Sequence, residues 1–200
     1  EPRDLAVTGR GYENVVFALD YLACQNRLCS GEKITGKIIS AKDKNVVVIG
    51  GGDTGSDCVG TARRQGAKNI YQLEILPKPP ETRPPDTPWP NWPRIMRTSS
   101  SHEEGCERMW GVKTTKLSGI ETSVNEVYGC SVEWSKTPRG WNIKEIPGTD
   151  FHIKADLVIL AMGFLHVKHD GLIKSLGLKL NENGNIACVD FQSSDPAVFV

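Results

Sequence analysis

The chain has 200 residues, of which 38% are hydrophobic, enough for one well-packed domain or slightly more. Lysine plus arginine and aspartate plus glutamate number 24 each, so no net charge draws the chain to nucleic acid or to an anionic membrane. Neither a long apolar run nor a basic leader followed by an apolar segment is present, so we expect no membrane span and no signal peptide.

The six cysteines are scattered along the sequence, and none of them forms a C-x-x-C pair. An iron–sulfur cluster, a zinc site and a dithiol redox centre therefore lack their usual spacing. His152, His166 and His169 lack a helical H-x-x-x-H pattern, so no metal site is predicted. Scattered thiols are typical of a reducing compartment, and we expect a cytosolic setting, with a plastid interior as the alternative.

The first part of the chain leads into a strongly apolar strand. Residues 14–27 are predicted to form an amphipathic helix because their apolar side chains recur on one face. Residues 34–43 read as a linker or a short strand. Asn45–Ile49 then forms a β-branched run, which is typical of a strand covered on both faces, as in a parallel sheet.

A glycine-rich turn follows this strand and fills the template G-x-G-x-x-G with Gly50, Gly52 and Gly55. Gly50 allows a tight turn, Gly52 lets a pyrophosphate approach bare backbone, and Gly55 lets the next helix lie close to the strand. That helix is predicted over residues 56–65, and a second apolar strand follows at 70–76. The N-terminus of the helix directs unpaired N–H groups and a positive dipole end toward phosphates.

The sequence therefore predicts a dinucleotide-binding site in this turn. Its expected residues are Gly50, Gly51, Gly52, Asp53, Thr54 and Gly55. Asp53 also fits the role of an N-cap that only starts the helix. The alternative for the whole motif is a glycine-rich turn in an α/β core that binds nothing.

Charged residues near the turn bear on the choice of cofactor. Glu74 lies about 20 residues beyond Gly55, the usual place of the acid that binds a ribose 2′-hydroxyl. Arg63 and Arg64 could instead reach a ribose 2′-phosphate, although a solvated helix end stabilised by the dipole explains them equally well. A carboxylate repels a phosphate, so these features indicate different cofactors, and both NADPH and NADH remain open.

The segment 77–93 contains eight of the twelve prolines, so it is predicted to be a long extended loop. Trp89 and Trp92 lie within it, and we expect their rings to be buried. The following Ser99, Ser100, Ser101, His102 and Glu103 contain the residue types of a hydrolase triad. Adjacent residues on a loop seldom converge in that way, and no G-x-S-x-G is present. We expect this loop near a nicotinamide or at a domain interface, and we predict no catalytic residue.

From residue 112 onward the pattern favours β-structure. Strand-length runs at 112–120, 127–135, 139–146 and 151–160 are separated by glycine and proline turns and resemble a β-meander. The run at 156–164 reads as another buried parallel strand. Gly163 and Phe164 would then line a ligand crevice at its end, or simply close a packed strand. A short helix is expected at 171–178.

Three stretches together resemble one family. GGGDTGSDC at 50–58, PWPNWPRIMRTSSSHEEG at 88–105 and DLVILAMGF at 156–164 are similar to the small (beta) subunit of glutamate synthase. The same pattern occurs in the C-terminal part of fused glutamate synthases. The glycine motif is shared by many pyridine-nucleotide enzymes, whereas the proline- and tryptophan-rich run is more particular. The resemblance covers essentially the whole chain.

The resemblance implies an α/β fold of the flavoprotein type that has two dinucleotide-binding domains. Residues 41–153 would be a Rossmann-like NAD(P)-binding domain with a parallel sheet plus a β-meander. Residues 1–40 and 154–200 would be fragments of the FAD-binding domain. The implied activity is electron input: NAD(P)H passes hydride to FAD, and iron–sulfur clusters outside this chain relay electrons to a large subunit or domain that makes glutamate from glutamine and 2-oxoglutarate. Within this resemblance, the sequence TSSSHEEG favours NADPH as the cofactor.

The resemblance also implies parts that this sequence lacks. A glycine motif for FAD and a cysteine-rich domain are expected before residue 1, and an A-G-D element is expected after Val200. We therefore expect this chain alone to bind a dinucleotide but to hold FAD weakly or not at all. Two alternatives remain open, a dihydropyrimidine-dehydrogenase-like or ferredoxin-coupled oxidoreductase subunit and a non-catalytic docking fragment.

Overall fold

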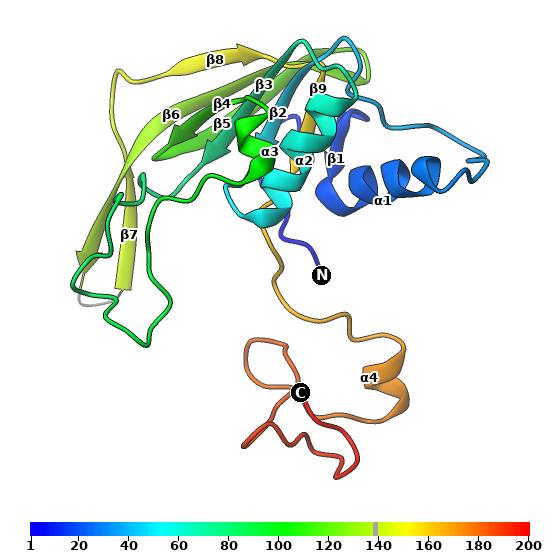
Figure 1. Cartoon of the computed structure of the whole chain (residues 1–200), viewed down its shortest axis with the longest axis vertical. Helices are drawn as coiled ribbons and strands as arrows, with labels where there is room; N and C mark the ends of the chain where they lie inside the picture. The colour runs from blue at the N-terminus through cyan, green and yellow to red at the C-terminus, as the bar shows by residue number, and fades with distance from the viewer. Residues whose placement is uncertain (138–139) are drawn as a thin grey trace. The chain divides into compact units, whose positions relative to one another are not determined.

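The computed structural model describes residues 1–137 and 140–200. The chain divides into two compact units, one formed by Leu5–Ala161 and the other by Glu1–Asp4 together with Met162–Val200. In chain order, the elements of the larger unit are β1 (Val15–Phe17), α1 (Ala18–Cys29), β2 (Asn45–Ile49), α2 (Asp53–Arg64), β3 (Asn69–Glu74), α3 (Ser100–Glu103), β4 (Glu107–Trp110), β5 (Val112–Ile120), β6 (Ser123–Thr137), β7 (Gly140–Glu145), β8 (Phe151–Lys154) and β9 (Leu157–Leu160) (Figure 1).

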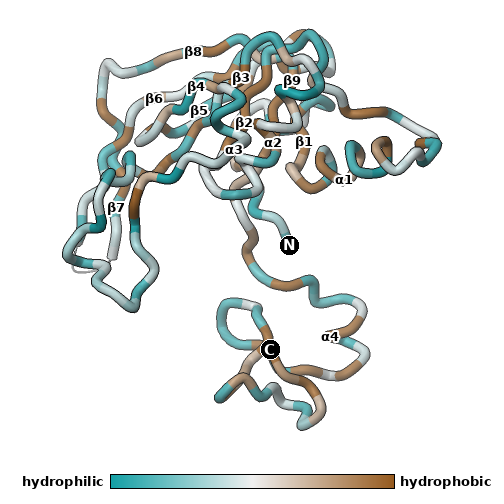
Figure 2. Tube along the Cα trace, viewed as in Figure 1, coloured by the Kyte–Doolittle hydropathy of each residue, from teal (hydrophilic) through white to brown (hydrophobic). Residues whose placement is uncertain are grey.

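A parallel sheet forms the centre of the larger unit, with the strand order β1-β9-β2-β3-β4. In its middle, Val47 of β2 is paired with Val158 of β9 on one side and with Tyr71 of β3 on the other. Val46, Val47 and Val48 are completely buried, as the β-branched run predicted. In Figure 2, hydrophobic segments of this unit lie in the central strands and also in α1. The expected α/β fold with a parallel sheet is thus confirmed.

The two faces of the sheet are covered differently. On one face α1 and α2 pack against alternate strand residues, and Val46, Val48 and Ile70 share a buried cluster with Cys58 and Val59 of α2. The side chains that alternate with these point to the other face of the sheet, which the antiparallel strands cover. Side chains of β8 and β3 line a common cavity on that face. Both faces of β2 are therefore removed from water, in agreement with its sequence, in which every residue after Asn45 is apolar.

The antiparallel strands form the meander that the turns predicted. The order is β5-β6-β7, and β8 also pairs with β6. The long strand β6 pairs with β5 and β8 along its first part and with β7 from Val132 to Thr137. The predicted run 139–146 begins at Arg139, which lies outside the described residues, and β7 is observed from Gly140 to Glu145.

The structure corrects one expectation at the start of the larger unit. The predicted helix 14–27 begins with strand β1, because Val15–Phe17 pairs in parallel with β9, and α1 follows only from Ala18. β1 and β9 lie in the same sheet as β2, and the chain divides by contacts at Leu5 and Ala161. The predicted assignment of residues 41–153 and of the flanking residues to two binding domains stays a prediction.

The smaller unit has little regular structure. Its helix α4 (Leu172–Ser175) is shorter than the predicted helix 171–178. Ile173 within α4 and Leu178 after it are buried apolar side chains of this unit. A β-bridge joins Pro2 to Phe164, and short bridges close its turns. None of the helices in the described part of the chain has the length and hydrophobicity that a membrane crossing requires.

Candidate dinucleotide-binding site

The glycine turn lies at the carboxyl edge of the parallel sheet, between the end of β2 and the start of α2 (Figure 1). β2 ends at Ile49 and α2 begins at Asp53, so the predicted strand-turn-helix is present. Gly52 is the N-cap, and within the described residues no side chain caps this end of the helix. The N–H groups of the first turn of α2 therefore have no partner inside the helix, which leaves them available to an anion.

The three motif glycines differ in what a side chain would meet. Gly50 has φ +124°, a backbone conformation that other residues rarely adopt. A Cβ at Gly55 would lie 2.3 Å from the carbonyl oxygen of Gly50, so only glycine lets α2 approach the strand this closely. A Cβ at Gly52 would meet nothing within 4 Å, so the space beside this residue is open. This is the space that a pyrophosphate needs at the motif's second glycine.

Two side chains of β3 hold the peptide group between Gly50 and Gly51. Gln72 Nε2 donates a hydrogen bond to the Gly50 carbonyl oxygen at 3.0 Å. Glu74 Oε2 accepts one from the Gly51 N–H at 2.7 Å, and its other oxygen accepts from Leu76 N–H at 2.9 Å. Glu74 thus lies at the turn, as its spacing predicted. Each carboxylate oxygen of Glu74 keeps a second lone pair, with which it can accept a hydrogen bond from a ribose hydroxyl.

Asp53 and Thr54 occupy the first two positions of α2. The N-cap is Gly52, so the N-cap role that the sequence allowed for Asp53 is not the one observed. As the first helical residue, Asp53 places a carboxylate near the positive end of the helix dipole, which favours the helix. The N–H groups of both residues belong to the open first turn.

Arg63 and Arg64 lie in the last turn of α2, roughly 16 Å along the helix from its start. Arg63 Nη2 donates to the Gly105 carbonyl oxygen at 2.8 Å, and Arg64 forms an ion pair with Glu104. Both guanidinium groups therefore bind the segment after α3 rather than pointing toward the glycine turn. This geometry gives no support to the prediction that they bind a ribose 2′-phosphate, and we leave them out of the proposed site.

Gly163 and Phe164 belong to the smaller unit. The Gly163 carbonyl oxygen accepts from Arg3 N–H at 2.9 Å, and Phe164 is 55% exposed. Their expected place in a ligand crevice stays a prediction.

A partly buried polar network behind the turn was not predicted from the sequence. Gln72, which is 2% exposed, also contacts His102 of α3, with 2.8 Å between Gln72 Oε1 and His102 Nε2. His102 Nδ1 lies 3.0 Å from Ser99 Oγ, and Ser99 is hydrogen-bonded to Ser56 of α2. Burial, and secondarily the positive charge of Arg108, lower the pKa of the His102 imidazole. The only signal in the sequence was the SSSHE stretch, which we placed on a loop near the nicotinamide or at an interface.

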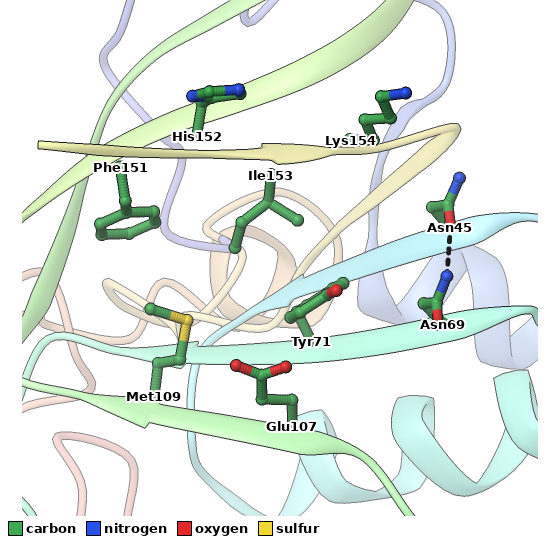
Figure 3. A pocket seen from close by; sticks show the side chains of 9 residues that line it. All are labelled: Asn45, Asn69, Tyr71, Glu107, Met109, Phe151, His152, Ile153 and Lys154. Carbon is green, nitrogen blue, oxygen red and sulfur yellow. Dashed lines mark hydrogen bonds between the residues drawn. The ribbon is translucent and has the colours of Figure 1, made fainter.

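The structure also contains an open cavity of about 440 Å³ on the face of the sheet that β8 covers. Figure 3 shows Phe151 and Ile153 pointing from β8 toward Tyr71 and Met109 of the sheet. The cavity reaches the first residues of β2 and β3, so it lies toward the amino edge of the parallel strands, away from the glycine turn. Parallel α/β sheets bind their ligands at the opposite, carboxyl edge, so we do not assign the dinucleotide to this cavity.

The site offers backbone donors and a helix dipole rather than reactive side chains. In the part of the chain that the structure describes, no group of three or more His, Cys, Asp or Glu side chains is placed to hold a metal ion. Burial raises the pKa of the Cys58 thiol in α2 to about 12, so this cysteine stays protonated and unreactive at neutral pH. A strand, a bare turn and an open helix N-terminus define the class of proteins that bind the diphosphate of a dinucleotide.

The chain belongs to the pyridine nucleotide-disulphide oxidoreductase family, whose model matches residues 1–200. It is 42% identical to the glutamate synthase [NADPH] small chain of Mycobacterium tuberculosis (strain ATCC 25618 / H37Rv), and the match covers 99% of this chain and 41% of that protein. It is also 42% identical to the glutamate synthase [NADH] of Schizosaccharomyces pombe, over 82% of this chain and 8% of that protein. The resemblance seen in the sequence is thus confirmed, and the chain spans about two fifths of the length of the small chain.

Solved structures confirm the fold. The T. acidophilum thioredoxin reductase is similar with a TM-score of 0.63 and 19% identity, over 100% of this chain and 53% of that one. FprA of Mycobacterium tuberculosis in complex with NADPH is similar with a TM-score of 0.62 and 13% identity, over 96% of this chain and 53% of that one.

Proposed function

We propose that this chain is the NAD(P)H-oxidising part of an electron-input subunit of the glutamate synthase type. The observation that carries the proposal is the glycine turn, in which Gly52 leaves open space in front of an uncapped helix N-terminus. The names of the relatives support the finer assignment, since the small chain from Mycobacterium tuberculosis is a glutamate synthase [NADPH] component.

A bound nicotinamide supplies the hydride and FAD accepts it, so the chemistry belongs to the cofactors. The residues of this chain bind and orient the dinucleotide. In the proposal, the N–H groups of Gly52, Asp53 and Thr54 receive the pyrophosphate, and Glu74 accepts from a hydroxyl of the adenosine ribose. No side chain of this chain is needed as an acid or a base.

The choice between the two nicotinamide dinucleotides rests on opposing features. The carboxylate of Glu74 at the turn favours the free 2′-hydroxyl of NADH. The relative that matches nearly the whole chain is an NADPH small chain, and the shorter match to the Schizosaccharomyces pombe protein is to an NADH enzyme. We propose NADPH as the substrate, with NADH as the dinucleotide to compare.

The electrons leave through a partner in this proposal. The Mycobacterium tuberculosis relative is named a small chain, and in the Schizosaccharomyces pombe protein the matching segment makes up 8% of one long chain. We propose a large subunit or domain as the partner and the cytosol as the compartment. The six free cysteines support a reducing setting.

Titration of the folded chain with NADPH and NADH tests the proposal, with tryptophan fluorescence as the signal. We expect saturable binding of both dinucleotides and tighter binding of NADPH. A chain that is folded by circular dichroism but responds to neither dinucleotide would contradict the proposal and would favour a docking fragment without a nucleotide.

A further inference from the structure

A continuous chain of hydrogen bonds links α3 to the glycine turn. It runs from Ser56 through Ser99 to His102, from there to Gln72, and ends on the Gly50 carbonyl oxygen. Its members come from three elements, α2, the start of α3, and β3. Because Gln72 is almost completely buried, leaving its amide unpaired would be costly, and the network satisfies both ends of that amide.

The partners fix which nitrogen of His102 carries the proton. The amide nitrogen of Gln72 must face the Gly50 carbonyl oxygen, which can only accept, so Gln72 Oε1 faces the imidazole. His102 Nε2 therefore donates to Gln72. His102 Nδ1 accepts from the backbone N–H of Ser99 at 3.2 Å, which completes the capping box of α3. Only the neutral imidazole protonated at Nε2 satisfies both partners.

We propose that His102 is a positioning residue for the dinucleotide: its neutral Nε2–H form orients Gln72, and Gln72 orients the Gly50–Gly51 peptide that shapes the turn. This inference rests on the proposed function. The other end of the same peptide is held by Glu74, so the turn is fixed from β3 at two points. Without His102 the amide of Gln72 can rotate, and the Gly50 carbonyl then loses its donor.

Protonation of His102 keeps the Nε2–H bond to Gln72 but removes the Nδ1 lone pair that accepts from the Ser99 N–H. The new Nδ1–H would turn to Ser99 Oγ, 3.0 Å away, so the Ser99 N–H would lose its acceptor and the capping box that holds His102 in place would open. Arg108 of β4 adds a positive charge near the ring, and β3 contributes the uncharged Gln72. From α2, Arg63 and Arg64 are bound to Gly105 and Glu104, and α3 itself carries Glu103. The neutral form is thus the bound form at neutral pH, and since the pKa of His102 is lowered, dinucleotide binding should weaken only at pH values below the ordinary histidine range.

The test measures the dissociation constant of NADPH between pH 5.5 and 8 for the whole chain and for His102→Gln and His102→Phe. We expect His102→Phe to weaken binding about tenfold at pH 8, the fold-change for the loss of one hydrogen bond from the bound state. His102→Gln keeps an amide donor and should recover part of the affinity. The 2′-phosphate of NADPH itself titrates near pH 6, so the readout is the difference between the wild-type and His102→Gln profiles. The advantage of the wild type over His102→Gln should shrink as the pH falls, because only the wild type has an imidazole to protonate at this position.

His152→Gln is the matched control, because His152 lies on β8 at the far cavity and outside the network. Its pH profile should follow the wild type. If the wild type binds NADPH and His102→Phe binds equally well with an unchanged profile, the positioning role is wrong and the proposed function stands. If the folded wild type binds neither NADPH nor NADH, the proposed function is wrong, and the positioning role that rests on it is wrong as well.

A measurement on the unaltered protein covers the case in which His102→Phe does not fold. Long-range ¹H–¹⁵N spectra of the histidine rings at pH 7.5 should show His102 protonated at Nε2 and unprotonated at Nδ1. They should also show it titrating below the ordinary histidine range. A ring protonated at Nδ1, or one that is charged at pH 7.5, would overturn the inference.

Discussion

At the scale of single residues, the motif glycines separate binding from folding. Gly52 has ordinary extended dihedral angles and open space around its Cβ position, whereas a Cβ at Gly55 would collide with the backbone of the turn. We therefore predict that Gly52→Ala weakens NADPH binding at least tenfold while the free energy of unfolding falls by less than about 1 kcal/mol. Gly55→Ala should instead lower the free energy of unfolding by about 2 kcal/mol.

Thermal denaturation and NADPH titration of the two variants check this contrast. Gly11→Ala serves as the control, because Gly11 also has nothing within 4 Å of its Cβ position and lies outside the turn. A Gly52→Ala variant with wild-type affinity would show that the pyrophosphate does not contact this backbone.

Thr114 of β5 offers a prediction about stability alone. Among the described residues, its hydroxyl is a buried side-chain oxygen without a hydrogen-bond partner, and the residue is 6% exposed. Thr114→Val keeps the shape and removes the unsatisfied hydroxyl, so it should raise the free energy of unfolding by about 1 kcal/mol. Urea denaturation measures the change. The exposed neighbour variant Thr115→Val should leave stability within about 0.5 kcal/mol, and a loss of stability in Thr114→Val would indicate a partner that we have missed.

How far the sequence specifies this site depends on the distance between the partners along the chain. Gly50, Gly52 and Gly55 act through local backbone geometry, so a pattern of six residues is sufficient to find them. The contacts of Gln72 with His102 join residues thirty positions apart, and a polar residue inside an apolar strand carries no mark of its partner. The partners of Arg63 and Arg64 likewise lie about forty residues further along the chain, after α3, so no local pattern shows them.

At the scale of elements, local periodicity predicted the strands and helices around the turn well. Local periodicity failed where pairing with a distant strand determines the secondary structure. Val15, Val16 and Phe17 fit a helical face, yet they form strand β1 because β9 offers a parallel partner. The loop after β3 is extended as its prolines predicted, but Trp89 and Trp92 are 83% and 77% exposed, so the expectation that their rings are buried is wrong in this chain. Instead, the guanidinium group of Arg97 lies over the ring of Trp92, with 4.0 Å between the Arg97 Cζ atom and the ring centre.

Hydrogen exchange should reflect the unequal burial of the strands. β2 and β9 are buried and paired on both sides, whereas every residue of β7 is exposed and β7 pairs with β6. We predict that the amides of β2 and β9 exchange at least about a hundredfold more slowly than those of β7. Exchange followed by mass spectrometry or NMR measures the ratio. Equal protection of β7 and β2 would mean that β7 is covered by something other than β6.

At the scale of the whole molecule, the family and the class of fold followed from three sequence stretches, whereas the order of the strands in the sheet was not predicted. The sheet includes β1 and β9 beside β2, and the separation of residues 1–40 and 154–200 from the nucleotide-binding domain stays a prediction. Strand order in a parallel sheet depends on long-range crossovers, so composition and turns alone do not show which segment enters the middle of the sheet.

The larger unit contains a core of its own, formed by α1, α2 and the parallel sheet. We therefore predict that a chain limited to residues 5–161 unfolds in one cooperative transition, with a midpoint within about 5 °C of that of the full chain. Circular dichroism during heating tests this. A truncated chain without a cooperative transition would show that the core needs residues 162–200.

Binding of the dinucleotide by the turn after β2 is the claim on which the account depends most. Backbone amide shifts in ¹H–¹⁵N spectra, recorded while NADPH is added to the labelled chain, locate the binding directly. We predict the largest shifts at Gly51, Gly52, Asp53 and Thr54, followed by Glu74. Shifts confined to Tyr71, Glu107 and Ile153 at the cavity under β8, with the glycine turn unchanged, would contradict the account.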